Sequence, residues 1–175
     1  LADLTFPMDA DSIRGWIEMT GDGYPANDTT DWYLTGVPAA AVVPYYTAFG
    51  NDDLYKGRRV QDINNDGSTW LRVDYEDNPM WYYVYSETNV ANDWLFSSCF
   101  DLQPGDYTLE FKDAGYVYYQ SESFGVYFGT SPNPADMTLI KNFTDVTNEE
   151  FAQASEFINI TTAGTCYIGF KASRN

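Results

Sequence analysis

Apolar and polar residues alternate with a period of two along much of this chain, and the spacing of an amphipathic helix is scarce. In the clearest run, Tyr107, Leu109 and Phe111 fall on one side and the polar residues between them fall on the other, as in a strand with one wet face. Turn residues separate such runs. The pattern predicts an all-β protein of about ten strands in a two-sheet β-sandwich.

The expected strands include residues 70–73, 80–85, 93–96, 99–102, 107–112, 116–119, 124–129, 137–140, 157–160 and 166–170. A further strand is expected at 16–19, and a single helical turn at 148–154. Pro38 interrupts the small apolar stretch at 36–43, and Pro44 is a plausible joint between the N-terminal residues and the rest of the chain. We therefore expect an N-terminal segment of unassigned role at 1–42 and one domain at 43–175.

The charge balance narrows the class of partner. The 175 residues include 9 Lys and Arg against 26 Asp and Glu, a formal net charge of −17. Nucleic acids and anionic membranes are disfavoured, because phosphate binding depends on Lys and Arg. No apolar run is long enough to span a bilayer. The composition favours divalent cations as ligands.

Histidine is absent from the chain, and this limits the catalytic arrangements that it can form. The commonest general base and the usual zinc ligand are missing, and with them the Ser-His-Asp and Cys-His arrangements. A pair of carboxylates can still hydrolyse glycosides. However, each acidic residue sits in a turn or a polar alternation where solvation accounts for it. We assign no catalytic residue and expect no enzymatic activity.

One segment has the composition of a cation site. Asp62, Asn64 and Asp66 stand at alternate positions ahead of Gly67, and their side-chain oxygens suit calcium if the glycine turns the backbone sharply. The resemblance to an EF-hand loop is only half complete, because the twelfth position falls on Val73 and no helical pattern flanks it. The alternative is a solvated turn rich in Asp and Asn.

The aromatic content suggests where a ligand would bind. The chain has 15 Tyr, 11 Phe and 5 Trp residues, a load typical of pleated sheets. Aromatic faces stack against sugar rings, and a tyrosine keeps its hydroxyl in water while its ring packs. Core packing is the alternative for each of them. The candidate contact residues are Trp81, Tyr83, Tyr85, Tyr116, Tyr118 and Tyr119.

The two cysteines, Cys99 and Cys166, each lie in an apolar, strand-like run. Either they form a disulfide, as is common in oxidising compartments, or both are buried thiols. The sequence leaves both alternatives open.

Five segments in a fixed order resemble the choice-of-anchor J and cleaved adhesin domains, which are related to MAM-type jelly rolls. The similarity covers about residues 43–174. Within it, the acidic turn is similar to the family's opening segment, and Trp94 and Leu95 to its apolar signature. The segments are DINNDGSTW (62–70), ANDWLF (91–96), FDLQPGDYTLEF (100–111), FGVYFGT (124–130) and CYIGFKA (166–172).

The resemblance implies a jelly-roll β-sandwich in a secreted or surface-anchored bacterial protein. Such domains adhere to host proteins or glycans, often contain bound calcium, and have no enzymatic activity. It therefore implies an extracellular module that binds carbohydrate or protein. A glycoside hydrolase accessory domain is the least favoured class, because no acid and base pair stands out.

Two departures from the family pattern matter. Ser98 and Cys99 stand where the family usually has a proline, and the chain stops soon after Phe170 without the family's last strand. Because an unpaired sheet edge is rarely left uncovered, we expect residues 4–6 or 16–19 to fill the gap. Alternatively, a neighbouring subunit supplies the strand, which would make the protein a structural subunit of an extracellular filament.

Overall fold

The chain divides into two units, Leu1–Ala39 and Ala40–Asn175. The computed structural model describes residues 13–16, 29–32, 40–50, 58–84, 86, 88–115 and 122–173. In the first unit, strands β1 (Ile13–Trp16) and β2 (Thr29–Trp32) pair antiparallel as a hairpin. In the described residues, no helix is long and apolar enough to cross a membrane.

The described part of the second unit is built from ten strands and one short 3-10 turn, η3, at Pro134–Asp136. These strands match the expected number, and most lie within a few residues of their predicted positions. They are β3 (Arg59–Gln61), β4 (Trp70–Tyr75), β5 (Asn78–Tyr83), β6 (Trp94–Phe96), β7 (Phe100–Leu102), β8 (Gly105–Asp113), β9 (Glu122–Gly129), β10 (Met137–Val146), β11 (Ala152–Ile160) and β12 (Gly164–Ser173).

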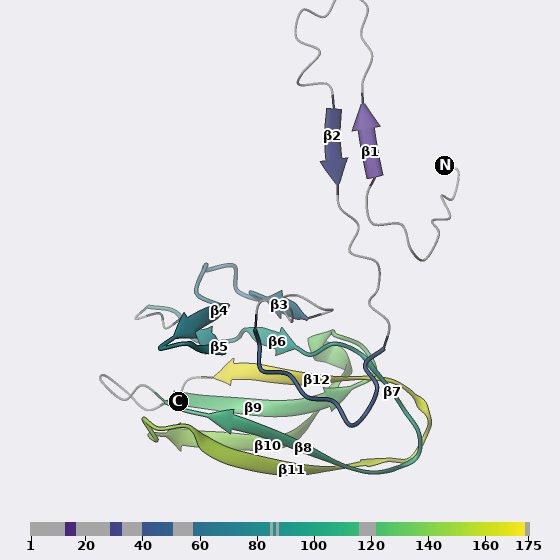
Figure 1. The fold of residues 1–175 in the computed structure, drawn as a ribbon. Helices are drawn as coiled ribbons and strands as arrows, with labels where there is room; N and C mark the ends of the chain where they lie inside the picture. The colour runs from purple at the N-terminus through teal and green to yellow at the C-terminus, as the bar shows by residue number, and fades with distance from the viewer. Residues whose placement is uncertain are drawn as a thin grey trace, which may run out of the picture. The chain divides into compact units, whose positions relative to one another are not determined.

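The strands form two layers, which confirms the predicted β-sandwich (Figure 1). The larger sheet has the order β10-β9-β12-β6-β3, and β7 also pairs with β12. The second layer is the β8–β11 ladder, in which Ala152–Ile160 pairs with Gly105–Asp113 over nine positions. The β4–β5 hairpin forms a separate two-stranded sheet.

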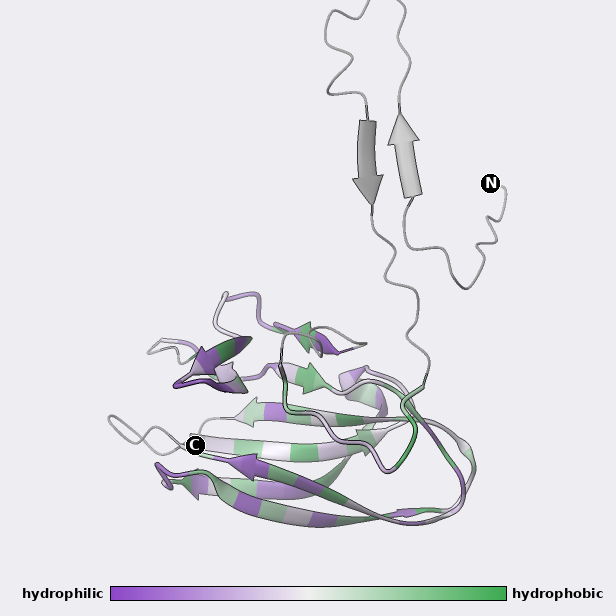
Figure 2. Cartoon of the chain, viewed as in Figure 1, coloured by the Kyte–Doolittle hydropathy of each residue, from purple (hydrophilic) through white to green (hydrophobic). Residues whose placement is uncertain are grey.

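Apolar side chains fill the space between the two layers. The buried residues of this core include Val126, which is fully buried, and Ile168. Phe111 of β8 reaches across from the second layer and makes edge contacts with Phe143 of β10 and Phe170 of β12 at centroid distances of 5.5 and 5.3 Å. Bands of apolar and polar residues alternate along the long strands in Figure 2. The core therefore depends on alternation in both layers.

Strand β8 shows the alternation that the sequence predicted. Tyr107, Leu109 and Phe111 are half-buried against the core, and the polar residues between them are exposed. One face of the ladder therefore lies on the larger sheet and the other faces water.

The helical turn expected at 148–154 is wrong. Strand β11 already begins at Ala152, and Ala152 pairs with Asp113 of β8. Inward and outward side chains then follow a period of two, with Ile158 and Ile160 buried and Phe157 and Asn159 exposed. Pairing with a long neighbouring strand overrides a short stretch of helix-favouring residues.

Cys99 and Cys166 are both buried, and they do not form a disulfide. Cys166 lies directly opposite Phe100 in the β7–β12 ladder, so these two side chains share the core face. Cys99 precedes Phe100 and points to the other face, where its thiol is hydrogen-bonded to the hydroxyl of Tyr167. Burial raises the pKa of the Cys166 thiol. The sheet itself separates the two sulfur atoms, so the bridge that the sequence left open is not made.

The residues that we expected to complete the unpaired sheet edge lie mostly outside the described part of the chain. Residues 4–6 and 17–19 lie outside the described ranges, and Trp16 ends β1, which pairs with β2. Where the second unit begins, the amide of Ala41 donates a hydrogen bond of 2.8 Å to the carbonyl of Cys99. Ala41 also forms a parallel bridge with Phe100. Strand addition from a neighbouring subunit stays a prediction.

Replacing the ring that links the two layers should destabilise the sandwich. Phe111→Ala removes contacts with Phe124, Phe143 and Phe170, and we expect a loss of about 3 kcal/mol in the free energy of unfolding. Phe157→Ala, which truncates an exposed ring on the same layer, should change it by less than about 0.5 kcal/mol. Urea denaturation of both variants measures this, and equal losses would contradict the assignment of the core.

Candidate metal centre

Three carboxylates converge at one edge of the larger sheet. Asp62, Asp66 and Asp93 each offer an oxygen, and these oxygens lie within 4.8 Å of one another. The register of the sheet produces this convergence: Gln61 of β3 pairs with Trp94 of β6, so Asp62, after β3, comes opposite Asp93, before β6. Asp66 joins them from the loop that follows.

The loop after β3 is shaped by its own acidic side chains. The Asp62 carboxylate accepts hydrogen bonds from the amides of Asp66 and Gly67 at 3.2 and 2.9 Å, and Asp66 accepts one from the amide of Ser68 at 2.7 Å. Asn65 and Gly67 have positive φ angles of 53° and 80°. Gly67 therefore provides the sharp turn that the sequence predicted, because glycine adopts this conformation without steric cost.

Asp93 is the buried member of the cluster, with no exposed surface. Its two carboxylate oxygens accept hydrogen bonds from the Ile63 amide at 2.9 Å and from the Tyr83 hydroxyl at 3.2 Å. Burial raises the pKa of Asp93, and the negative charges of Asp62 and Asp66 raise it further. A bound cation would relieve this repulsion.

Asn64 lies beside the cluster and supports it as a donor. Its amide nitrogen donates to the Asp66 carboxylate at 3.0 Å and to the Val90 carbonyl at 3.2 Å. Asn64 thus ties the acidic loop to the segment before β6, and its role as a ligand stays a prediction.

Sequence reasoning missed Asp93 as a member of this group. The residue lies 30 positions after Ile63, beyond the reach of any local motif. The available signal was the polar pair Asn92 and Asp93 directly before the apolar strand Trp94–Phe96.

The donor set fits a hard divalent cation. All three side chains are carboxylates, whose oxygens are the ligands that calcium prefers. Each carboxylate has about four lone-pair sites, so the protein hydrogen bonds that it accepts leave sites for a metal. The loop lies between β3 and β4, two strands, and therefore differs from an EF-hand, which is flanked by helices.

The β4–β5 hairpin is anchored on the same aspartate. The indole nitrogen of Trp70 donates to the Asp93 carbonyl at 3.2 Å, and the Tyr83 hydroxyl donates to its carboxylate. The rings of Trp70 and Tyr83 meet edge to face with centroids 5.5 Å apart. Ala172 of β12 also donates to the Asp93 carbonyl, at 2.9 Å. Asp93 thus connects the three carboxylates, the hairpin and the larger sheet.

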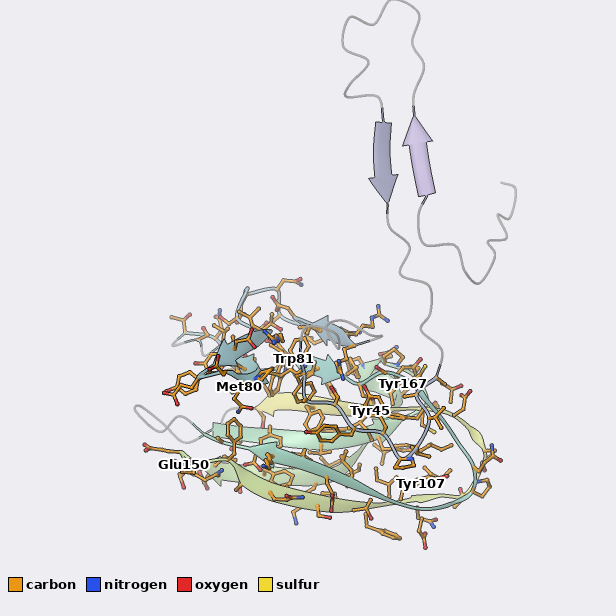
Figure 3. All side chains as sticks on the ribbon, viewed as in Figure 1. Tyr45, Met80, Trp81, Tyr107, Glu150 and Tyr167 are labelled. Atoms are coloured by element: carbon orange, nitrogen blue, oxygen red, sulfur yellow. The ribbon has the colours of Figure 1, made fainter. Side chains whose placement is uncertain are left out.

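The predicted aromatic contact residues do not form one open face in the described structure. Trp81 is half-buried with its indole nitrogen covered, and Tyr83 is half-buried against Trp70 and Asp93. The exposed ring of this strand is Tyr82, on the other face. Figure 3 shows Trp81 and Met80 on the side of the unit away from Tyr107. The remaining candidates, Tyr85, Tyr116, Tyr118 and Tyr119, lie outside the described residues.

An open hollow of about 640 Å³ adjoins the cluster. Asn64 and Val90 belong both to the wall of this hollow and to the hydrogen-bonded edge of the cluster. Amide and hydroxyl groups are the partners that sugar hydroxyls require. The lining residues are Asn64, Thr88, Asn89, Val90, Ala91, Asn92, Lys171 and Ser173.

The fold has counterparts among solved structures. The K1 cleaved adhesin domain of Lys-gingipain from Porphyromonas gingivalis W83 is 18% identical, with a TM-score of 0.52 over 68% of this chain and 82% of that domain. This chain shares the fold of a cleaved adhesin domain. The K3 domain from the same strain is 14% identical with a TM-score of 0.47, over 68% and 81% of the two chains.

The K2 domain of Lys-gingipain is 15% identical, with a TM-score of 0.47 over 68% of this chain and 82% of that domain. No family model and no curated protein matches the chain. The K1 likeness supports the predicted β-sandwich, and membership of the choice-of-anchor J family stays a prediction.

Removing the hydroxyl of Tyr83 should loosen the hairpin. Tyr83→Phe leaves one oxygen of the buried Asp93 without its side-chain donor, and we expect the free energy of unfolding to fall by about 1–2 kcal/mol. Tyr82→Phe, on the exposed face of the same strand, is the matched control and should have no effect. Chemical denaturation distinguishes them, and indistinguishable midpoints would refute the anchoring role.

Proposed function

We propose that this chain is a non-catalytic adhesion module that acts outside the cell and binds its ligand with the help of calcium. The observation that carries the proposal is the convergence of Asp62, Asp66 and Asp93 within 4.8 Å on a sandwich whose fold matches the K1 adhesin domain. The fold supports the adhesive class, and the carboxylates support the cation. We place the protein at the bacterial cell surface or in the medium.

Calcium is the cation that this donor set favours. The cluster supplies carboxylate oxygens from the loop after β3 and from the residue before β6, and calcium accepts the irregular geometry that such ligands form. Burial of Asp93 beside two other carboxylates costs free energy when no cation is bound. The cost falls when calcium binds, so the metal stabilises the loop, β6 and the hairpin together.

Carbohydrate or a host protein is the ligand class that we propose. The hollow beside the cluster offers the side-chain amides of Asn89 and Asn92 for sugar hydroxyls. Because Asn64 is hydrogen-bonded to Asp66, calcium at the cluster would hold one wall of this hollow in place. Ligand binding is therefore expected to require the metal.

The described acidic cluster suits cation binding better than glycoside hydrolysis. A hydrolase needs one carboxylate on each side of an accessible glycosidic bond, about 5–9.5 Å apart. Asp93 has no exposed surface, and one of its oxygens lies within 4.8 Å of an oxygen of Asp62 and of Asp66. A buried carboxylate in this position is poorly placed to meet a glycosidic bond.

Calcium should raise the melting temperature by several degrees, because it binds only the folded cluster. A concentration of one hundred times Kd corresponds to about 2.7 kcal/mol. The increment should shrink as the pH falls toward the pKa of Asp93, which burial raises above its ordinary value, because protons then compete with calcium for this carboxylate. Without calcium, the raised pKa works in the opposite direction, so protonation of Asp93 stabilises the folded state as the pH falls.

Thermal melts in calcium and in chelator at several pH values test this. Asp62→Asn/Asp66→Asn should abolish the increment, whereas Glu149→Gln, which removes one exposed carboxylate elsewhere, should keep it. Identical melts of the unsubstituted protein in calcium and chelator would remove the metal from the proposal.

The adhesive function is tested by binding of the full chain to glycan arrays and to immobilised extracellular matrix proteins. We expect binding in calcium buffer and a loss of at least tenfold in chelator. Asn89→Ala, in the wall of the hollow, should weaken binding to a glycan, with Glu149→Gln again as the control. A protein that binds nothing on either panel would overturn the adhesive proposal.

A further inference from the structure

The outward face of the β4–β5 hairpin is apolar and open to solvent. Alternation places Leu71, Val73 and Tyr75 of β4 on one face with Met80 and Tyr82 of β5. Leu71 pairs with Tyr82 and Val73 with Met80, so the side chains form a continuous strip. Leu71, Tyr75 and Tyr82 are 50%, 59% and 41% exposed. We call these five residues the hairpin strip.

The other face of the hairpin is fixed on the domain, so the strip cannot turn inward. Trp70 and Tyr83 are held by Asp93. Arg72, on the same face, donates from Nε to the Phe49 carbonyl at 3.1 Å. A two-stranded hairpin is marginal by itself, and these contacts hold it in one orientation with its apolar side in water.

Acidic residues border the strip at the turn of the hairpin. Glu76 and Asp77 form this turn with φ angles of 50° and 60°, and both are exposed. Asp74 forms an ion pair with Arg72 on the opposite face. The strip therefore lies beside two carboxylates on a chain with a formal net charge of −17.

We propose that the hairpin strip docks a basic segment of a protein partner, one that carries apolar side chains flanked by Lys or Arg. This proposal rests on the adhesive function above, and it specifies the chemical character of the partner that binds one surface of the domain. An apolar centre with a charged rim is the usual anatomy of a protein interface. The carboxylates of Glu76 and Asp77 select a cationic rim on the partner.

Charge complementarity decides against the other occupants. A second copy of this chain would bring the same carboxylates against the strip, and like charges in contact cost free energy. A sugar would find hydrogen-bonding groups only on Tyr75 and Tyr82, because Leu71, Val73 and Met80 at the centre of the strip offer none to its hydroxyls. An anionic surface would be repelled by the same acids.

The test uses fluorescein-labelled peptides of about twelve residues, in which Phe and Ile are flanked by Lys. A charge-reversed set carries Glu in place of Lys. Fluorescence anisotropy with the full chain in calcium buffer, at low and moderate salt, should show saturable binding of the basic set only. Leu71→Ser/Tyr82→Ser keeps the charge of the protein and should weaken that binding at least tenfold.

Two further variants complete the experiment. Glu76→Gln/Asp77→Asn should weaken binding several-fold at low salt and flatten its salt dependence. Phe157→Ser removes an exposed ring of similar accessibility from β11, which is not part of the hairpin, and should leave binding unchanged. Circular dichroism and melting in calcium confirm that each variant is folded.

Several results would overturn the inference. One is the absence of saturable peptide binding. Others are equal binding of the basic peptides by the unsubstituted protein and by Leu71→Ser/Tyr82→Ser, and equal binding of the basic and the charge-reversed peptides. A further one is that the substitutions change only the oligomeric state measured by sedimentation. If the glycan or matrix panel still shows calcium-dependent binding in those cases, the adhesive function stands and only the hairpin strip is refuted.

Discussion

The antiparallel pairing of β3 with β6 is the constraint on which the functional end of this protein depends. The register that sets Gln61 opposite Trp94 also sets Asp62 opposite Asp93, and two carboxylates are thereby forced together at a buried edge. Burial and the neighbouring carboxylates raise the pKa of Asp93, so this arrangement disfavours its charged form. The backbone hydrogen bonds of the ladder offset that cost. The fold thus creates an electrostatic cost in one place, and the proposed cation would remove it.

The two ends of the unit are stabilised differently. Around Phe111, Val126 and Ile168, packed apolar side chains from two layers exclude water, and stability there scales with apolar area. Around Asp93, backbone and side-chain hydrogen bonds carry the structure, and the β4–β5 hairpin has no sheet neighbour among the described strands. The first region serves as a rigid scaffold. The second contains the acidic cluster and the hairpin, and the proposed binding surfaces lie there, as binding residues commonly lie on segments positioned by a scaffold.

The sequence predicted the features that depend on local pattern. Alternation through Tyr107, Leu109 and Phe111 indicated a one-sided strand, and Gly67 indicated the turn of the acidic loop. The sequence did not reveal the features that depend on strand register. Asp93 meets Asp62 only because β3 pairs with β6, and the thiols of Cys99 and Cys166 lie on opposite faces because Cys166 pairs with Phe100. The helical turn expected near Ala152 failed because a long neighbour, β8, recruited the segment as a strand.

The hydrogen bond from the Tyr83 hydroxyl to the Asp93 carboxylate has a thermodynamic consequence. It joins a residue of the hairpin to a proposed ligand of the metal, so the free energies of the two events cannot be independent. If calcium stabilises the hairpin and thereby favours a macromolecule that binds there, then by reciprocity the bound macromolecule raises the affinity for calcium by the same factor. An attached protein would then bind its metal more tightly than a detached one, and depletion of calcium from the surroundings would favour detachment.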